Sequence, residues 1–152
     1  MKHLPRRGFT MIEILIVIAI IAVMAGVMIY ALDPTRQLAK GRNAQRRSNI
    51  MTLVNAIGQN MADNRGSFNC AAGIVPATST VLGSGGGQYN IHDCLVPAYL
   101  PSLPYDPTAP SSSFVSSSSY NTQYTILRNA STGRITVGAP FAEIGESISE
   151  TR

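Results

Sequence analysis

One acidic residue stands at the start of a long apolar stretch near the N terminus. Glu13 is followed by Ile14 to Leu32, in which every residue is apolar or small. An ionisable group in such a stretch is costly in lipid, is usually paired with an opposite charge and often has a function. Thr10 lies three residues before Glu13, which is the spacing of a helix capping box. Glu13 is therefore a candidate both for charge pairing and for capping a helix.

A short basic segment precedes this stretch and ends in a small residue. Arg6 and Arg7 come directly before Gly8 and Phe9. An ordinary secretory signal has a shorter apolar core, a small-residue cleavage site behind that core, and is discarded. Here the cleavage site would lie in front of the apolar stretch. A cut after Gly8 would keep the apolar helix and give Phe9 a free amine, a natural partner for Glu13.

The apolar stretch is long enough to cross a membrane. Its nineteen residues, Ile14 to Leu32, would form a helix that spans roughly the 30 Å of a bilayer core. Basic residues lie on both sides, three in the first seven residues and five between Arg36 and Arg47. A basic cluster beside a membrane span favours contact with lipid headgroups over nucleic-acid binding. A nucleic-acid face formed by Arg42, Arg46 and Arg47 stays as an alternative without stacking aromatic residues nearby.

Two cysteines lie far beyond the apolar stretch. Cys70 and Cys94 would close a loop of about 25 residues, and we expect a disulfide, with two unpaired thiols as the alternative. A zinc site with His92 would lack an obvious fourth ligand. His92 and Asp93 form a lone pair, which predicts an exposed loop rather than a catalytic dyad. Because no nucleophile motif or phosphate loop is present either, we predict no enzyme activity, no cofactor and no metal.

The segment from Arg7 to Ile21 resembles the N-terminal signature of type IV prepilins and type II secretion pseudopilins. It has a basic leader ending in Gly8, an aromatic Phe9, a glutamate at the fifth place after the cut and an unbroken apolar helix. The resemblance implies that a prepilin peptidase cuts between Gly8 and Phe9 and methylates the amine of Phe9. It also implies that Glu13 pairs with the N-terminal amine of a neighbouring subunit in a filament.

The resemblance implies an α+β fold, in which a long N-terminal helix packs on a small antiparallel sheet. We expect a leader at residues 1–8, a transmembrane and filament-core helix at 9–32, an amphipathic continuation at 33–65 and a globular head at 66–152. Asp33 and Pro34 favour a helix restart. An apolar stripe then predicts the face that packs on the head, and it comprises Ile50, Leu53, Val54, Ile57 and Met61.

The head is expected to contain short strands and loops. Alternation from Tyr120 to Arg128, a turn at 131–133 and the segment Arg134 to Val137 predict an antiparallel hairpin. The Gly-rich segment 83–87 and the Ser-rich segment 111–119 are interpreted as loops. The segment from Tyr99 to Pro107 resembles part of the head of major pseudopilins, some of which bind calcium. We predict no calcium site, although Asp93 and Asp106 leave that alternative open.

The resemblance implies that the chain is a structural subunit. It would be stored in the cytoplasmic (inner) membrane with its head outside, and an inner-membrane assembly platform would extract it into a filament in the periplasm or on the cell surface. The filament would be a type IV pilus or a type II secretion pseudopilus, built from identical or related subunits. The alternative is a single-pass membrane-anchored binding protein that does not polymerise, which would not need Glu13.

Overall fold

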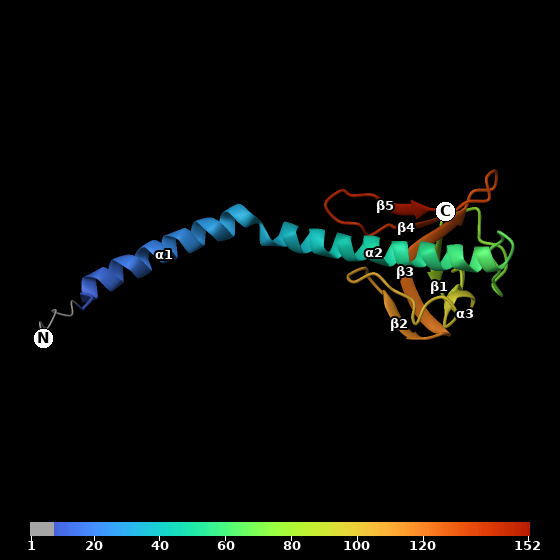
Figure 1. Ribbon diagram of the computed structural model, residues 1–152, viewed down its shortest axis with the longest axis horizontal. Coiled ribbons are helices and arrows are strands. Elements are labelled where there is room, and N and C mark those ends of the chain that lie inside the picture. The colour runs from blue at the N-terminus through green and yellow to red at the C-terminus, as the bar shows by residue number, and fades with distance from the viewer. Residues whose placement is uncertain (1–7) are drawn as a thin grey trace, which may run out of the picture. The chain divides into compact units, whose positions relative to one another are not determined.

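The computed structural model describes residues 8–152, and it divides into one unit ending at Leu38 and a second unit, Ala39–Arg152. The described residues form three helices and five strands (Figure 1). The helices are α1 (Met11–Leu32), α2 (Pro34–Asp63) and α3 (His92–Leu95). The strands are β1 (Thr80–Gly83), β2 (Ser113–Ser116), β3 (Ser119–Arg128), β4 (Ile135–Ala139) and β5 (Ile148–Thr151).

Helix α1 is apolar apart from Glu13 in its first turn, and it has no buried residue. It is long and apolar enough to cross a membrane, as the sequence predicted. It ends at Asp33, whose backbone is in the left-handed region with φ of 40°. The carboxylate of Asp33 accepts hydrogen bonds from the Thr35 hydroxyl and the Arg36 N–H. Asp33 thereby caps α2, which begins at Pro34, so the predicted restart is confirmed.

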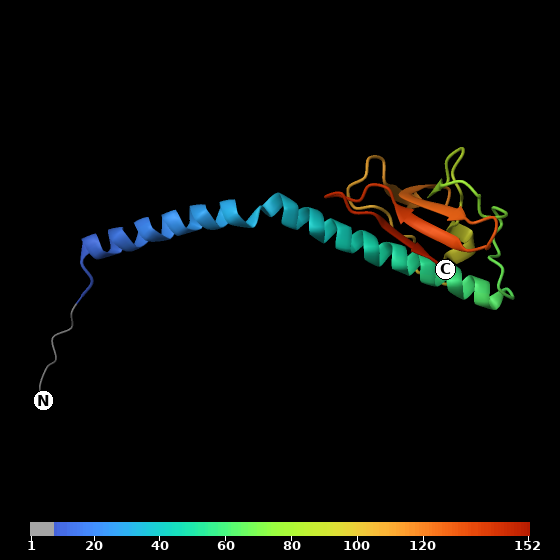
Figure 2. The ribbon, with the colours of Figure 1, turned by 90° about the horizontal axis from the view of Figure 1, so that it is seen from above.

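Helix α2 packs its apolar stripe on the head. Ile50, Leu53, Val54 and Ile57 are buried in the core, and Met61 is partly buried against it. Figure 2 shows α2 lying along one face of the sheet. The helix ends near Gly66, whose N–H donates to the Met61 carbonyl at 2.7 Å and whose φ is 86°. A left-handed glycine at this point closes the helix, close to the expected end of the amphipathic segment at residue 65.

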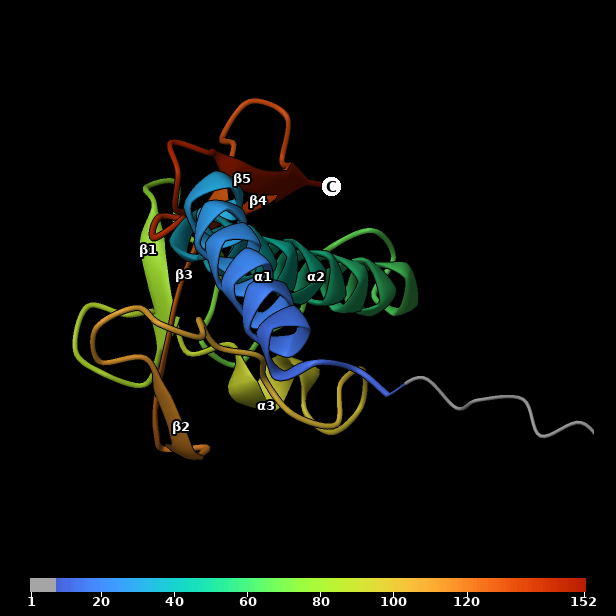
Figure 3. The same ribbon diagram turned by 90° about the vertical axis from the view of Figure 1, so that its left-hand side faces the viewer.

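The sheet has five strands, all paired antiparallel, in the order β1-β3-β4-β5, with β2 also paired to β3. The view along the chain in Figure 3 places β4 and β5 at one side and β2 with α3 at the other. The β3–β4 hairpin predicted from the sequence is confirmed, with Gly133 at φ 72° in its turn. One face of β3 is buried through Tyr120, Thr122, Tyr124 and Ile126, while Arg128 at the end of the same alternation is half-buried.

The interpretation of the Ser-rich segment 111–119 as a loop was wrong in part. Residues Ser113–Ser116 form β2, and Ser119 begins β3. The pairing is made by backbone groups and by the contact of Phe114 with Tyr120, so serine side chains do not prevent it. Similarly, Gly83 ends β1 instead of starting a loop, because it pairs with Asn121 of β3. A side chain at Gly83 would collide with Gln88 and approach the Tyr120 carbonyl.

The expected disulfide joins Cys70 to Cys94, with 5.0 Å between the two Cα atoms. Cys94 lies in α3 and belongs to the buried core, while Cys70 lies in the segment that follows α2. The bridge therefore ties this segment to the centre of the head. In the chain-entropy model a loop of this size stabilises the fold by about 3 kcal/mol.

Candidate functional site

The residues of the predicted processing site are accessible. Gly8 and Phe9 are exposed, with 80% of the Phe9 surface accessible, while residues 1–7 of the leader lie outside the described residues. Thr10 precedes the first turn of α1, and its hydroxyl accepts a hydrogen bond from the Glu13 N–H at 3.3 Å.

Glu13 completes the capping box that its spacing predicted. One Glu13 carboxylate oxygen accepts from the Thr10 N–H and from the Thr10 hydroxyl, both at 3.3 Å. These contacts are long and exposed, so they hold the carboxylate only weakly. Glu13 makes no ion pair among the described residues. Its pairing with an amine of another subunit stays a prediction.

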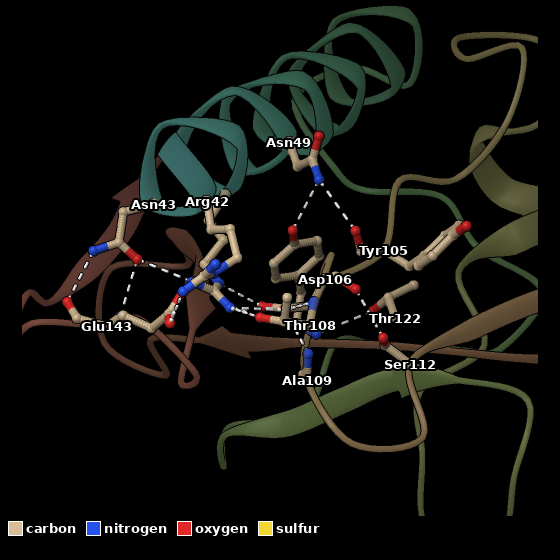
Figure 4. Close-up of polar contacts among 12 residues, drawn as sticks. Arg42, Asn43, Asn49, Tyr105, Asp106, Thr108, Ala109, Ser112, Thr122 and Glu143 are labelled. Atoms are coloured by element: carbon tan, nitrogen blue, oxygen red, sulfur yellow. Dashed lines mark hydrogen bonds and ion pairs between the residues drawn. The ribbon is translucent and has the colours of Figure 1, made fainter. Parts of the chain in front are cut away.

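A second polar site lies where α2 meets the head (Figure 4). At its centre, the Arg46 side chain is 1% exposed and forms a two-pronged pair with Asp106, through Nε to Oδ2 at 2.7 Å and Nη2 to Oδ1 at 3.0 Å. Arg46 also donates to the Thr108 hydroxyl at 2.8 Å and to Glu143 at 2.8 Å. A buried charge of this kind requires such complete pairing to be tolerated.

Asp106 is fully buried, and several donors converge on its carboxylate. Oδ1 accepts from the Thr108 N–H at 2.9 Å and the Ala109 N–H at 2.8 Å, in addition to Arg46. Burial alone would raise the pKa of Asp106, but the hydrogen bonds from Arg46 and the two backbone amides outweigh it and hold the pKa below its ordinary value. Asp106 therefore stays ionised inside the head.

Two further arginines of α2 pair with the segment between β4 and β5. Arg42 forms a fork with Glu143, with distances of 2.7 Å from Nε and 2.6 Å from Nη2. Arg47 pairs with Glu146 at 2.5 Å, and Asn43 exchanges hydrogen bonds with the Glu143 backbone at 2.8 and 2.9 Å. Hydrogen bonds from Arg42 and Arg46 lower the pKa of Glu143 to about 2. This segment is thus bound to α2 by charge and by amide contacts.

The sequence-based interpretation of these arginines was wrong. Arg42, Arg46 and Arg47 were assigned to lipid headgroups, with nucleic acid as the alternative, but all three pair with carboxylates of the head. The acidic partners lie 60 to 101 residues away along the chain, so no local pattern reveals them. One signal was available. Arg46 lies four residues before Ile50, on the line of the apolar stripe, which places its side chain toward the core.

Asp106 and His92 lie in surroundings that the sequence did not predict. Asp106 is engaged by Arg46 and two amides, so its carboxylate is not free to bind calcium. His92 is half-buried in α3 rather than exposed in a loop, and it stacks on Phe114 with 5.7 Å between ring centres. Its Nδ1 lies 2.6 Å from the Asp93 carboxylate. Across residues 8–152 the structure shows no cluster of three potential metal ligands.

The carboxylates of this site predict how head stability depends on pH. The pKa of Glu143 falls from an ordinary value of 4.5 to about 2, and that of Asp106 is also lowered. The folded head therefore binds fewer protons than the unfolded chain between about pH 5 and pH 2. Its stability should be complete above about pH 5 and should fall as the pH approaches 2. Urea midpoints at several pH values, followed by tyrosine circular dichroism, would measure this loss.

Replacing Glu143 tests how much of this loss of stability in acid is caused by its carboxylate. Glu143→Gln should lower stability at neutral pH and make the loss of stability toward pH 2 less steep than in the wild type. Glu150→Gln serves as the charge-matched control, since Glu150 makes no ion pair among residues 8–152. An acid response in Glu143→Gln as steep as that of the wild type would contradict the assignment.

The comparison with protein-family models finds one match that bears on the N terminus. Residues 4–29 match the model described as the prokaryotic N-terminal methylation motif. The match covers the predicted cleavage site between Gly8 and Phe9, Glu13 and most of α1. Among curated proteins and among solved structures, none matches this chain. With an apolar α1, a capped Glu13 and an antiparallel head, the chain therefore carries the N-terminal signature of type IV pilins and pseudopilins.

Proposed function

We propose that this chain is a structural subunit of a type IV pilus-like or type II secretion pseudopilus filament. The observation that carries the proposal is a helix, α1, with no buried residue and a single acidic residue at its start, inside the matched methylation motif. Such an apolar surface needs lipid or other apolar helices around it. A subunit that is stored in a membrane and then packed into a filament core meets this need in both states.

The proposed processing follows from the signature. A prepilin peptidase would cut between Gly8 and Phe9 on the cytoplasmic side and methylate the new amine of Phe9. The mature subunit would remain in the inner membrane through Ile14 to Leu32, with the head outside. An assembly platform in that membrane would then deliver it to the growing filament, in the periplasm or at the cell surface.

The proposed assembly step depends on charge pairing by Glu13. The carboxylate would leave its exposed cap at Thr10 and pair with the Phe9 amine of a neighbouring subunit among packed apolar helices. Removing one partner of a buried ion pair leaves an uncompensated charge, which is strongly destabilising. A subunit in the wrong axial position would leave both charges unpaired, so the pair would select the correct register.

The competing function is a membrane-anchored binding protein that does not polymerise. It is favoured by the same apolar α1, which would serve as an anchor without cleavage. It gives no role to a glutamate at the start of the span or to a small residue before Phe9. These two features make the filament subunit the better explanation of the sequence.

The test is to follow the N terminus and the location of the protein in its native host. We expect mass spectrometry to find a methylated Phe9 as the first residue, and sheared filaments to contain the mature chain. Gly8→Val should block cleavage, because the cut requires a small residue, and should leave the protein in the membrane. Gly26→Ala, which replaces a glycine with open space around it in α1, is the matched control and should be cleaved normally.

Two outcomes would overturn the proposal. If the wild-type chain keeps its leader in the host, the signature is not used. If it is cleaved but is found only in the membrane under conditions in which filaments are made, it is an anchored protein instead.

A further inference from the structure

Three arginines meet at one end of the sheet, remote in sequence from the arginines that bind the head to α2. Arg128 ends β3, Arg134 precedes β4 and Arg152 follows β5. The antiparallel register brings these strand ends together, since Arg128 pairs with Ile135, and Ile135 exchanges backbone hydrogen bonds of 2.8 and 2.9 Å with Arg152. The Arg134 carbonyl closes the turn by accepting from the Asn129 N–H at 2.8 Å.

A cavity of about 430 Å³ lies against these arginines. It is also lined by residues of the last turn of α2 and of the segment after it, where the apolar residues are Met61, Phe68, Ile74 and Val75. Ile74 is 80% exposed, and Met61 and Phe68 are half-buried. The cavity has the size of a small-ligand site and combines one cationic wall with one apolar wall.

The three arginines of the cationic wall form no salt bridge among the described residues. No Asp or Glu among residues 8–152 lines the cavity. By contrast, Arg42, Arg46 and Arg47 are all paired. A guanidinium group presents its donors in a planar fork that matches a carboxylate or phosphate. A lining of this kind favours an anion over a cation.

We propose that this arginine cavity, formed by Arg128, Arg134 and Arg152 facing Met61, Phe68 and Ile74, binds an acidic peptide segment of a partner protein. The segment would carry a carboxylate beside an apolar side chain. The carboxylate would lie against the guanidinium groups, and the apolar side chain would cover Ile74 and Phe68. Such a segment would bury the exposed apolar surface of the cavity and also pair with its arginines, and both contacts would stabilise the complex.

The apolar wall distinguishes this ligand from nucleic acid. Single-stranded nucleic acid binds through phosphates together with bases stacked on aromatic side chains. Phe68 is the single aromatic residue that lines the cavity, and it is half-buried. Free phosphate would engage the arginines but would leave Met61 and Ile74 uncovered. A peptide with alternating acidic and apolar residues satisfies the site more completely.

A glycine in α2 positions one of the three arginines. Gly58 is buried, and a Cβ atom at this position would collide with the guanidinium group of Arg152. The Arg152 side chain lies across the helix at this point, where its Nη1 is 3.5 Å from the Asn55 side-chain oxygen. Glycine destabilises a helix relative to alanine. At Gly58 a glycine is needed because the Arg152 side chain occupies the space of a Cβ atom. Gly58→Ala should displace this guanidinium without harming the helix.

The test uses the full chain in phosphatidylcholine nanodiscs and a fluorescein-labelled peptide of alternating Glu and Leu, followed by fluorescence anisotropy. We expect saturable binding that weakens about tenfold in Arg134→Ala, because charge-assisted hydrogen bonds are lost. Arg36→Ala removes the same charge from the exposed start of α2 and should bind as the wild type does. Gly58→Ala should bind more weakly while its thermal midpoint is unchanged or higher.

Two competitor probes decide what the cavity recognises. The same peptide with Gln in place of Glu should bind at least tenfold more weakly. A single-stranded oligothymidylate of matched charge should compete poorly. The proposal is overturned if the Gln peptide binds equally well, if Arg134→Ala and Arg36→Ala behave alike, or if the oligothymidylate binds more tightly than the peptide. None of these results bears on cleavage after Gly8 or on filament assembly, so the two proposals fail independently.

Discussion

Replacing Arg46 by Met should lower the free energy of unfolding of the head by about 3–5 kcal/mol. The methionine can fill much of the space of the arginine stem, so the loss comes mainly from charge. Asp106 is fully buried and would keep only the amides of Thr108 and Ala109 and no cation. Glu143 would also lose one of its two arginine partners. An uncompensated buried carboxylate is among the most destabilising changes a small core can receive.

The neighbouring arginine is the matched control. Arg47 lies on the same helix and also forms an ion pair, but its side chain is 57% exposed and that of Glu146 is 30% exposed. Arg47→Met should therefore change stability by no more than about 1 kcal/mol. The two variants have the same change in charge and the same new side chain. The difference between them isolates the effect of burial.

A double variant tests whether the cost arises from the orphaned carboxylate. Adding Asp106→Asn to Arg46→Met removes the buried charge but keeps an oxygen that can accept from the Ala109 amide. It should recover at least half of the lost stability. Urea unfolding of the full chain in nanodiscs can be followed by near-ultraviolet circular dichroism, because the chain has six tyrosines and no tryptophan. Equal effects of Arg46→Met and Arg47→Met would contradict the role assigned to the buried pair.

Local patterns in the sequence were sufficient for α1 and α2, but not for the short helix α3. Length and apolar composition predicted α1, and the spacing of Thr10 and Glu13 predicted its cap. Asp33 and Pro34 predicted where α2 starts, because capping and proline placement act over a few residues. The stripe from Ile50 to Met61 predicted the buried face of α2. These features rest on local geometry, which a single sequence contains.

Local patterns also predicted one hairpin of the sheet, but they did not predict its other strands. Alternation along β3 and the turn at Gly133 predicted the β3–β4 pair. Strands β1, β2 and β5 are four residues long each and lie in segments rich in Gly, Ser and Thr, so they carry little apolar signal. Their pairing is decided by backbone hydrogen bonds to β3 and β4 once those strands are in place.

The polar sites depend on contacts between distant segments and could not be predicted from spacing. The partners of Arg42 and Arg46 come from two separate head segments, around Asp106 and around Glu143. The number of basic residues near the apolar stretch suggested contact with a membrane surface. In the folded protein, however, three of the arginines among them pair with carboxylates of the head. The arginine cavity was missed for the same reason, since its three cations belong to three different strand ends. The sequence shows how many charged residues the chain has, but only the folded structure shows which of them are paired.

Replacing Glu13 by Gln should leave cleavage and membrane insertion intact but reduce filaments below about a hundredth of the wild-type amount. Gln keeps the shape of the side chain and can also complete a capping box, so the start of α1 is preserved. It cannot form an ion pair with the Phe9 amine of a neighbouring subunit. The amine would then be buried unpaired among apolar helices, at a cost of about 3–5 kcal/mol per subunit contact. A cost of that size lowers an association constant by more than about a hundredfold.

Thr10→Ala provides the complementary control. It removes the hydroxyl that accepts from the Glu13 N–H but keeps the Glu13 carboxylate, so it lowers helix capping by about 1 kcal/mol without touching the charge. Filaments sheared from cells that express each variant would be compared with the membrane fraction, and the N terminus would be checked by mass spectrometry. Assembly by Thr10→Ala but not by Glu13→Gln would show that the charge matters and the cap does not. Assembly by Glu13→Gln but not by Thr10→Ala would reduce Glu13 to a capping residue, and the proposed pairing in the filament core would be wrong.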